Sequence, residues 1–584
     1  MIGRVKVVDT GSVIVEVPDD ADLADIQVNQ FVWIRSTRVN ERIMGIVVRI
    51  MSRKVESPCN DAMSANTNAS PSCQGDEPQF FIRNGVYVEL FGTWRVSVPD
   101  FGLSNSETLN QNAEISDCVG VFRRALDVVP SIDADVNVLT GDELARFMRS
   151  LTNGGVAPLR LGTYALANDA TAELDGNRFF QRHAAIVGGT GSGKSYTVAT
   201  ILEQAANLKS ANALVFDIHG EYATLETENV VRLKIAGPSD SPDTSGVLFL
   251  PYWLFSYEEA ELLLLERKDS NASNQASVLM NGICVCKQKS ATYVNMSKNG
   301  EFDITVESPI PYRLSDLTAI LESGEGKKVG GENSGKAKMT NLVSRLEIKR
   351  RNKRLNFIFN DDPKLQETSW LKGFVRNLIG FGKSARGVKI IDFSEVPADL
   401  LPLAAGLVAR LVFSLQLWTV EEARQPMALF CEEAHLYMVD SDAAGIAGLG
   451  ARSFARIARE GRKYGMSLVV ISQRPSELNK TVLSQCGTVV AMRLTNLEDQ
   501  NTIRRLLPDN MGGIASVLPI LDVGEALVVG DACPIPSRIR IKSPVHAPRS
   551  VTVDIWSKWT ASDSGELDVD RILRAMCLQR KNVI

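Results

Sequence analysis

The stretch GGTGSGKS, residues 188–195, combines glycines with a lysine and a serine at a spacing that suits phosphate binding. It matches the phosphate-binding loop (P-loop) pattern, in which a glycine, four variable residues and a second glycine precede Lys-Ser. The apolar HAAIV leads into it as a strand and SYTVATILEQ follows as a helix, which is the context that this loop requires. The expected nucleotide-binding residues are Gly188, Gly189, Thr190, Gly191, Ser192, Gly193, Lys194, Ser195 and Tyr196.

The composition of this loop follows from the chemistry of phosphate. Glycines let backbone N–H groups curl around phosphate oxygens without Cβ clashes, and the positive end of the next helix points at the same anion. Lys194 would reach the β- and γ-phosphates, and the Ser195 hydroxyl would ligate Mg²⁺. A glycine-rich turn with an incidental lysine is the alternative, but spacing and context both favour a P-loop. The chain lacks the N-K-x-D and T-K-x-D motifs that read guanine, so ATP is the favoured nucleotide.

A second stretch, ALFCEEAH at residues 428–435, places two adjacent glutamates directly after a short apolar run. The lead-in MALF has the pattern of a buried strand, so Glu432 and Glu433 would emerge at its carboxyl end, where α/β sheets bind ligands. A P-loop ATPase needs one carboxylate for the Mg²⁺ shell and another to orient and activate water. We assign the metal to Glu432 and the water to Glu433, with their mutual repulsion offset by the metal and Lys194.

Two other interpretations of the acidic pair are open. The pair could be a solvated strand end, which would leave the P-loop without its usual partner. Glu432 and His435 also have the E-x-x-H spacing of di-iron helical bundles, but such sites need two copies. None of the other three histidines has a glutamate three residues before it.

Two more polar side chains follow apolar runs. Gln473 closes the run in LVVISQRP and could sense the γ-phosphate, and Asp217 closes the run in LVFDIHGEY and could touch the water shell of the metal. Ordinary turn formation is the alternative for both, because Asp, Gln and Gly often close strands. We therefore include Gln473 among the candidate catalytic residues and Asp217 among the candidate metal-binding residues.

The segment ARSFARIAREGRKYG carries a basic stripe, made of Arg452, Arg456, Arg459 and Lys463 at intervals of four, three and four. That spacing puts them on one face of a helix. Arg462 stands three residues from Arg459 and projects near it. The stripe could supply an arginine finger to a neighbouring subunit, line a channel for DNA phosphates, or be a solvated helix face.

The overall composition is that of a multidomain globular protein. Its 584 residues suit roughly three or four domains, and 44% of them are hydrophobic, as packed cores require. Lys+Arg minus Asp+Glu is 64 − 69 = −5, so any contact with nucleic acid needs a local basic surface. Nine scattered cysteines without zinc or redox spacing favour a reduced, cytoplasmic protein.

No membrane segment is expected. The N-terminal MIGRVKVVDTGSVIVEV alternates like a strand and lacks the apolar core of a signal peptide. The stretch LLPLAAGLVARLVFSLQLW carries Pro402 and Arg410, and an arginine at mid-span would cost a few kcal/mol in lipid. We interpret this stretch as a core helix.

The first part of the chain, residues 1–172, predicts a small β-barrel. Short strand patterns are separated by Gly, Asp and Asn turns, namely VKVV, VIVEV, FVWI, IMGIVVRI, VYVEL, VNVLT and LRLGTY. Residues near 53–78 are rich in Ser, Asn, Pro and Asp, so we expect a long exposed and disordered loop there.

From residue 173 strands alternate with helices, which predicts an α/β fold with a mainly parallel sheet. We expect this core at 173–256 and 346–545, interrupted by a helical insertion at 257–345 and followed by a C-terminal tail or brace at 546–584. The core resumes with a predicted strand in LNFIF, residues 355–359, and the basic KRRNKR before it is expected to be a solvated turn.

Five motifs, in this order, carry a resemblance to a known family: GGTGSGKS, DIHGEY, CEEAH, AREGRKYG and ISQRPSEL. The chain resembles the HerA family of hexameric ATPases, within the HerA/FtsK superfamily of DNA pumps. The resemblance covers nearly the whole length, because the N-terminal strands look like the family's HAS barrel and the helical insertion falls where the family has one. It implies a RecA-like P-loop NTPase core.

The resemblance also implies a homohexameric ring that hydrolyses ATP at subunit interfaces and moves double-stranded DNA through its centre. By motif match, Lys194 and Ser195 carry the nucleotide, Glu432 the metal and Glu433 the hydrolytic water, and Arg459 or Arg462 is the trans finger.

Family members act with a partner, either the nuclease NurA in DNA-end resection or an effector of phage defence such as a nuclease or a sirtuin-like NAD-consuming enzyme. The barrel is the expected docking surface. The long loop near 53–78 and the glycine-rich 323–337 depart from the better-known members, which leaves the partner open.

Two other functions are compatible with the same residues. One is an ATP-gated ring scaffold that assembles and activates an effector enzyme with little translocation of its own, for which the net charge of −5 and the exposed barrel loops speak. The other is a small-molecule P-loop kinase, which would need a mobile arginine-bearing lid and rarely uses tandem glutamates.

Overall fold

The structure is a computed structural model, and it describes residues 1–18, 26–38, 40–56, 80–95, 120–151, 158–165, 167–265, 272–290, 292–294, 303–323, 336–380, 387–439, 445–507, 509–550, 554–560 and 568–578. These residues form two compact units. The first unit comprises Met1–Gly176, Leu507–Pro519 and Glu525–Ile541, and the second comprises Asn177–Leu506, Ile520–Gly524 and Lys542–Ile584.

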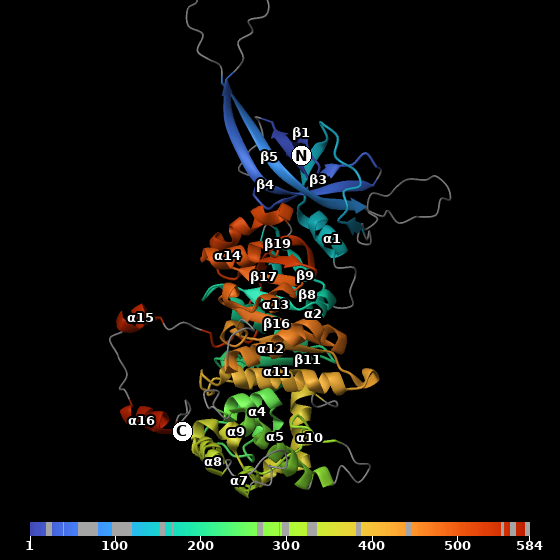
Figure 1. Ribbon diagram of the computed structural model, residues 1–584. Coiled ribbons are helices and arrows are strands. Elements are labelled where there is room, and N and C mark those ends of the chain that lie inside the picture. The colour runs from blue at the N-terminus through green and yellow to red at the C-terminus, as the bar shows by residue number, and fades with distance from the viewer. Residues whose placement is uncertain are drawn as a thin grey trace, which may run out of the picture. The chain divides into compact units, whose positions relative to one another are not determined.

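The N-terminal strands of the first unit form a sheet that closes on itself (Figure 1). They are β1 (Gly3–Val8), β2 (Ser12–Val17), β3 (Phe31–Arg35), β4 (Glu41–Glu56), β5 (Phe80–Arg95), β6 (Val121–Arg123) and β7 (Asp135–Val138). They pair in the order β2-β1-β7-β3-β4-β5-β6, and β2 also pairs with β5, which closes a barrel. Side chains alternate, so that Val13, Val15 and Val17 of β2 are buried. The predicted N-terminal β-barrel is confirmed.

Four further strands of the first unit pair antiparallel in the order β18-β19-β8-β9. They are β8 (Leu159–Tyr164), β9 (Ala167–Leu174), β18 (Glu525–Gly530) and β19 (Cys533–Ile541). The assignment of LRLGTY to the barrel is therefore wrong, because β8 pairs with β9 and β19 instead. Helix α1 (Gly141–Leu151) packs on the barrel through Phe147, whose ring lies 5.3 Å from that of Trp94.

The predicted loop near 53–78 begins later than expected. Residues 53–56 continue β4, where Glu56 pairs with Phe80 of β5. The remainder of the predicted loop lies outside the described residues.

The second unit is built on a parallel sheet. Its strands lie in the order β13 (Val247–Leu248), β12 (Val230–Ile235), β14 (Gly387–Asp392), β11 (Asn212–Asp217), β15 (Met427–Cys431), β16 (Met466–Ser472), β10 (Ala184–Val187) and β17 (Thr488–Met492). Strands β10, β11 and β16 are buried along their whole length, as expected when helices cover both faces of a parallel sheet. The predicted α/β, RecA-like P-loop core with a mainly parallel sheet is confirmed.

Helices surround this sheet, except for α15 and α16, which have no buried residues. These helices are α2 (Gly176–Gln181), α3 (Lys194–Ala206), α4 (Tyr257–Leu264), α5 (Ala272–Lys289), α7 (Leu314–Ser323), α8 (Lys336–Arg351), α9 (Asn356–Phe359), α10 (Thr368–Ile379), α11 (Leu401–Trp418), α12 (Ile446–Glu460), α13 (Lys480–Ser484), α14 (Leu497–Arg504), α15 (Ile555–Thr560) and α16 (Val569–Leu578). Figure 1 shows α4, α5, α7, α8, α9 and α10 gathered next to α11. The expected insertion at 257–345 is helical, but α9 and α10 lie beyond its expected end, so the helices continue where the core was expected to resume.

Short 3₁₀ turns link these elements. They are η3 (Glu221–Thr224), η4 (Tyr252–Leu254), η6 (Lys353–Leu355), η7 (Pro363–Gln366), η8 (Glu421–Ala423), η9 (Ala434–Leu436), η10 (Gly461–Tyr464), η11 (Pro475–Glu477) and η12 (Asp509–Ile520). Several follow strands directly, so the chain turns sharply where the sheet ends.

The predicted strand in LNFIF is wrong, because residues 353–359 form η6 and α9. The side chain of Asn352 accepts a hydrogen bond from the N–H of Arg354 and starts this turn, and periodicity alone does not separate a short apolar strand from a buried helix. The basic KRRNKR is accordingly the end of α8 and the start of η6 rather than a turn before a strand.

Helix α11 is the apolar stretch that we interpret as a core helix. Among the described helices it alone is long and apolar enough to cross a membrane, and 72% of its apolar window is buried inside the protein. Arg410 pairs with the buried Glu259 of α4, with Nε 2.9 Å from Oε1 and Nη2 2.8 Å from Oε2. This ion pair explains how an arginine is accommodated in the middle of an apolar helix.

Candidate nucleotide-hydrolysis site

The P-loop lies between β10 and α3 in the second unit and is folded as the sequence predicts. Gly191 and Gly193 adopt positive φ angles of 70° and 111°, which glycine adopts without strain. A Cβ on Gly188 would lie 2.6 Å from Ser192 Oγ, so the close turn requires glycine there as well. The turn is held by Ser192 Oγ, which donates to the backbone oxygen of Gly189 at 2.7 Å. Lys194 Nζ donates to the same oxygen at 3.0 Å, so its ammonium group lies against the loop.

The order of the strands brings the other predicted residues to this loop. β11, β15, β16 and β10 are consecutive neighbours in the parallel sheet, so their carboxyl ends share one edge. Asp217 ends β11, Glu432 and Glu433 follow β15, Gln473 follows β16, and the P-loop follows β10. Four separate parts of the sequence therefore converge on one site.

Glu433 leaves the strand in a left-handed conformation, with φ 43° and ψ 42°. Its Oε1 accepts a hydrogen bond from the amide Nε2 of Gln473. Its Oε2 is buried without a hydrogen-bond partner among the described residues, and His435 Nδ1 lies 3.4 Å away. One carboxylate oxygen is thus held, and the other is available to a water molecule or a metal ion.

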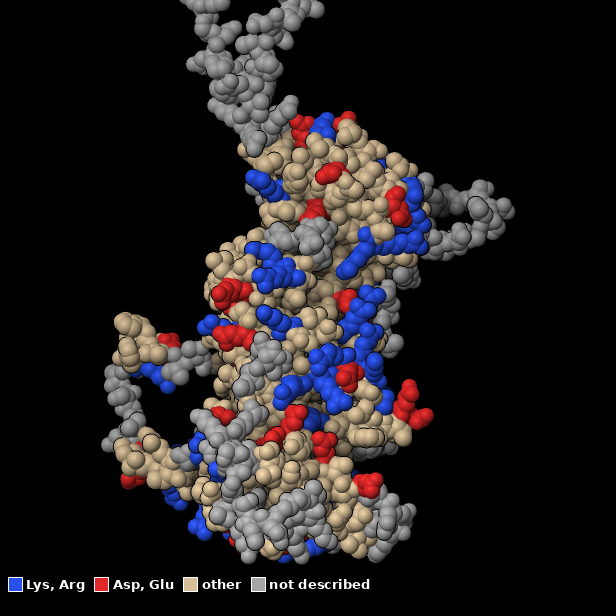
Figure 2. All heavy atoms as spheres, viewed as in Figure 1, with Lys and Arg blue, Asp and Glu red and all other residues tan. Residues whose placement is uncertain are grey.

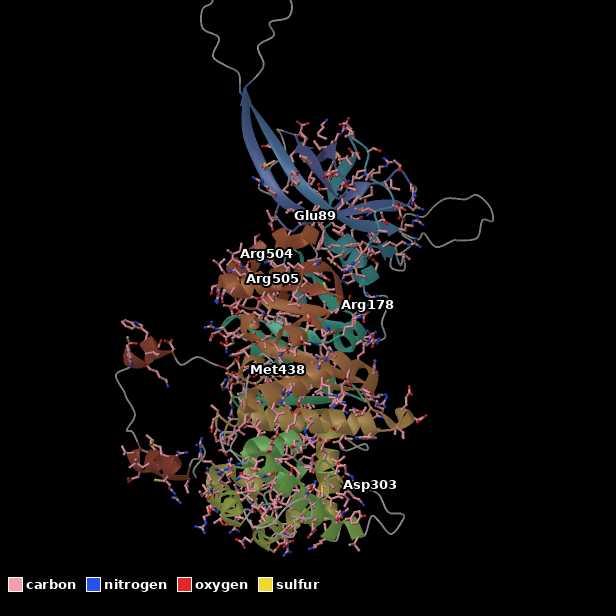
Figure 3. The ribbon with its side chains drawn as sticks, viewed as in Figure 1. Glu89, Arg178, Asp303, Met438, Arg504 and Arg505 are labelled. Atoms are coloured by element: carbon pink, nitrogen blue, oxygen red, sulfur yellow. The ribbon has the colours of Figure 1, made fainter. Side chains whose placement is uncertain are left out.

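The segments that carry Glu433 and Gln473 are tied together beyond the site. Met438, labelled in Figure 3, follows η9, and its backbone oxygen accepts from the N–H of Asn479 at 2.8 Å. The side-chain amide of Asn479 donates to the backbone oxygen of Val439 at 3.2 Å. These bonds fix the loop after β15 against the loop after β16.

Glu432 is almost fully buried, with 3% of its surface exposed. Tyr222 donates its hydroxyl to Glu432 Oε1, and Tyr437 donates its hydroxyl to the Glu432 backbone oxygen at 2.7 Å. Burial and the nearby Glu221 raise the pKa of Glu432 well above its usual range, while the Tyr222 hydrogen bond acts in the opposite direction. The ionised form of Glu432 therefore depends on Tyr222 and on positive charge nearby.

Lys194 faces the acidic residues. Burial lowers the pKa of its ammonium group, and attraction to Glu433, Glu432 and Glu221 offsets only part of that decrease. Three carboxylates near one lysine leave an excess of negative charge, which a divalent cation would offset. The buried Glu433 Oε2 without a partner is an oxygen suited to such a cation or to its water.

These residues fit a Mg²⁺ ion that arrives with a nucleotide. The described residues contain no ready-made group of three acidic, histidine or cysteine ligands. Mg²⁺ does not require one in nucleotide sites, because one or two carboxylates, several waters and substrate phosphates hold it. Ser195 and Glu432 are the residues that could hold it here, with Glu433 beside them.

Asp217, expected beside the metal, accepts hydrogen bonds from the backbone of the turn that follows β11. Its Oδ1 accepts the backbone N–H groups of Gly220 and Glu221 at 2.8 and 2.9 Å, and its Oδ2 accepts that of Tyr222 at 3.0 Å. Burial raises its pKa to about 6. Asp217 therefore positions the turn that carries Glu221 and Tyr222, and its contact with the metal's water shell stays a prediction.

Tyr222 and Glu221 are site residues that our reading of the sequence missed. Both belong to DIHGEY, where only the aspartate was given a chemical role. The signal was the glycine after the strand, because Gly220 at φ 73° turns the chain back so that the next two residues face the acidic pair.

The basic stripe lies on α12 and η10 as predicted, and Figure 2 shows Lys and Arg side chains gathered where Figure 1 places α12. Arg452 pairs with Glu258 at 3.0 Å and Arg456 with Glu460 at 3.4 Å. Arg459 and Arg462 are exposed, and neither forms an ion pair with any residue that the structure describes. Among the arginines of α12 and η10, these two are therefore the ones without an ion pair to any described residue, and they could act on another molecule.

The end of α12 is fastened to the sheet by a buried histidine. His183 Nε2 lies 3.0 Å from the backbone oxygen of Ala458, and its Nδ1 accepts the N–H of Leu468 at 2.9 Å. Burial lowers the pKa of His183, so the ring is neutral, as these two bonds require. The histidine thus fixes the backbone from which Arg459 projects.

The P-loop follows β10, and the acidic pair follows β15, which is separated from β10 by β16 alone. This arrangement defines a P-loop NTPase with a RecA-like core. The sequence model described as "Helicase HerA, central domain" matches residues 159–412. Over these residues the chain is therefore similar to the HerA helicases, a family of P-loop ATPases.

Two relatives illustrate the similarity. The chain is 27% identical over 495 residues to the DNA double-strand break repair helicase HerA of Pyrococcus furiosus, covering 77% of this chain and 81% of that protein. It is 25% identical over 392 residues to the probable helicase MJ1565 of Methanocaldococcus jannaschii, covering 66% and 67%. Among solved structures, the plasmid coupling protein TrwB in complex with a non-hydrolysable ATP analogue is a distant likeness, with a TM-score of 0.44, 16% identity and coverage of 70% of this chain and 94% of that one.

Proposed function

We propose that this protein is an ATP-driven motor that moves double-stranded DNA through a homohexameric ring. The observation that carries the proposal is the charge arrangement around Lys194, which faces Glu432 and Glu433 at the shared edge of the sheet. HerA proteins of Pyrococcus furiosus and Sulfolobus acidocaldarius are described as DNA double-strand break repair helicases, which supports DNA as the substrate.

Hydrolysis would use the groups of this chain in distinct roles. Lys194 and the P-loop amides bind the β- and γ-phosphates, and Ser195 and Glu432 hold the Mg²⁺ that accompanies them. Glu433 accepts, through the free Oε2, a proton from the water that attacks the γ-phosphorus, while the bond to the β-γ bridging oxygen breaks and ADP and phosphate form. Gln473 contacts the γ-phosphate and Asp217 supports the metal side of the site.

The ring completes the site from a neighbouring subunit. Arg459 or Arg462 would reach the γ-phosphate bound by the next protomer, because both are exposed and without ion pairs among the described residues. Their neighbours on the stripe would meet DNA phosphates, which a chain with a net charge of −5 can attract only through such a local basic surface.

The remaining parts of the chain receive roles by family resemblance. We divide it into a barrel formed by β1 to β7, an ATPase core built on the parallel sheet, a helical region from α4 to α10 and a C-terminal brace at 546–584. The barrel would dock an effector enzyme, a NurA-like nuclease or a sirtuin-like NAD-consuming enzyme, in DNA-end processing or in antiviral defence in the cytoplasm.

The test measures ATP hydrolysis with and without duplex DNA, and displacement of the third strand from a triplex. We expect DNA to stimulate hydrolysis, and Lys194→Ala and Glu433→Gln to abolish both activities. Lys209→Ala and Glu422→Gln, matched changes at exposed positions away from the site, should leave both unchanged.

The outcomes separate the candidates. Unaltered ATP turnover in both site variants would overturn the assignment of the site. Hydrolysis that depends on Lys194 but displaces no third strand would favour the ATP-gated ring scaffold over the translocase.

A further inference from the structure

A chain of hydrogen bonds links the P-loop to the acidic pair. The hydroxyl of Thr190 donates to Oε1 of Gln473 at 2.7 Å, and Nε2 of Gln473 donates to Oε1 of Glu433. Thr190 is exposed on the P-loop, so its side chain takes no part in packing the core. The contribution of the threonine side chain at this position is therefore its hydrogen bond to Gln473.

This chain decides which oxygen of Glu433 is free. Oε1 is occupied by Gln473, and Oε2 is buried without a hydrogen-bond partner among the described residues, with His435 Nδ1 3.4 Å away. Glu433 sits in a left-handed turn with φ 43°, where its backbone is held by the N–H of Leu436, which donates to the Glu433 oxygen at 2.8 Å. With the backbone fixed, the remaining freedom of the carboxylate is rotation of its side chain, and the Gln473 amide restricts that rotation.

The amide of Gln473 needs a second contact to be restrained. An amide that donates at one end can still pivot about that bond, and Thr190 holds its oxygen at the other end. Supporting hydrogen bonds of this kind orient a reactive group, and their removal typically lowers activity about 10- to 100-fold.

We propose that Thr190 is a positioning residue for Glu433 that acts through Gln473. The inference rests on the proposed function, because it deepens the role of Glu433 as the group that accepts the proton of the attacking water. Thr190 then does two things: its backbone belongs to the phosphate cradle, and its hydroxyl sets the orientation of the carboxylate.

The test uses the full-length protein and compares Thr190→Val, which keeps the shape but removes the hydroxyl, with Thr190→Ser, which restores it. We expect Thr190→Val to lower kcat about tenfold, at the low end of the loss typical of a supporting hydrogen bond, because Thr190 contacts Gln473 and not Glu433 itself. The KM for ATP should stay within about twofold of wild type. Thr190→Ser should hydrolyse ATP within about twofold of wild type.

A double-mutant cycle asks whether the chain acts as one unit. Gln473→Met removes the amide at similar size, and Thr190→Val combined with Gln473→Met should be no slower than Gln473→Met alone, since the hydroxyl then has nothing left to position. Thr502→Val serves as the matched control, because its exposed hydroxyl donates to the backbone oxygen of Glu498 at 2.9 Å, in α14. It should leave kcat unchanged.

Three results would overturn the inference. They are a wild-type kcat in Thr190→Val, a loss confined to KM, and losses that multiply in the double variant. Binding of a fluorescent ATP analogue and thermal melting verify that each variant is folded and loaded. If Glu433→Gln is inactive while Thr190→Val matches wild type, this inference fails and the proposed function stands. If Glu433→Gln and Lys194→Ala both hydrolyse ATP like the wild type, the proposed function fails.

Discussion

Replacing Tyr222 with phenylalanine isolates the contribution of a single hydroxyl to the site. Tyr222 is 1% exposed, so the phenylalanine ring keeps the packing and only the bond to Glu432 Oε1 is lost. Because Glu432 is itself buried, no water from bulk solvent replaces that bond directly. The variant therefore tests the electrostatics of Glu432 rather than the stability of the fold.

The size of the effect follows from the bond that is removed. A hydrogen bond to a charged group is worth roughly 1.5–3 kcal/mol, and a shift of one pKa unit corresponds to about 1.4 kcal/mol. The Tyr222 bond lowers the pKa of Glu432 against a larger rise caused by burial, so its loss raises that pKa further. If hydrolysis requires ionised Glu432, the acidic limb of the rate profile moves to higher pH. A bond worth roughly 1.5–3 kcal/mol then corresponds to a loss of about 10- to 150-fold in kcat/KM at a pH on that limb.

The assay is kcat/KM for ATP between about pH 5 and 9, which reports the ionisations of the free enzyme. Tyr437→Phe is the matched control, because that hydroxyl donates to the backbone oxygen of the same residue and not to its carboxylate. It should leave the acidic limb in place. An acidic limb that Tyr222→Phe fails to move, or that Tyr437→Phe moves equally, would refute the reasoning.

Two further predictions concern other charged groups. Either Arg459→Ala or Arg462→Ala, depending on which residue is the arginine finger, should lower the rate of ATP hydrolysis about 10³- to 10⁵-fold. Mixing that variant with Lys194→Ala subunits should restore part of the ATPase activity. No recovery on mixing would argue against action between subunits. Lys287 is 1% exposed, and burial lowers the pKa of its ammonium group to about 7. Between about pH 7 and 10.5 the unfolded chain therefore binds this proton more tightly than the folded chain. The free energy of unfolding should rise with pH across that window by up to roughly 1 kcal/mol per pH unit. Lys287→Met should flatten that rise in melting temperature between pH 7.5 and 9.5, and an unchanged slope would count against it.

The sequence was sufficient to predict the parts of the site that depend on local pattern. The P-loop spacing predicted the cradle, and the polar residues that close apolar runs predicted what would meet at the carboxyl edge. The strands that carry Glu433, Gln473 and the P-loop are neighbours in the sheet, so parallel pairing alone brings them together. The N-terminal barrel was predictable for a similar reason, because alternation along each strand is a local signal.

The features that the sequence did not reveal depend on partners far apart in the chain. Strand β8 has the pattern of a barrel strand, and only its pairing with β19 about 375 residues later places it elsewhere. The same limit applies to Tyr222, whose hydroxyl meets a carboxylate 210 positions away. Asp217 is predictable as a polar residue at a strand end. The three backbone N–H groups that donate to it belong to a turn whose geometry no spacing rule describes.

The two adjacent glutamates are able to differ because the backbone between them changes direction. In an extended strand successive side chains point to opposite faces, and the Glu432 N–H still bonds the backbone oxygen of Phe216 at 3.3 Å, beside the neighbouring strand. Glu433 then turns into the left-handed region, which costs a non-glycine residue roughly 1–2 kcal/mol. The strained turn serves the site, because it leaves Glu432 in contact with Tyr222 and places Glu433 in contact with Gln473. Gln473 in turn bonds to the P-loop. Like charges in consecutive residues are thereby given separate partners around one lysine.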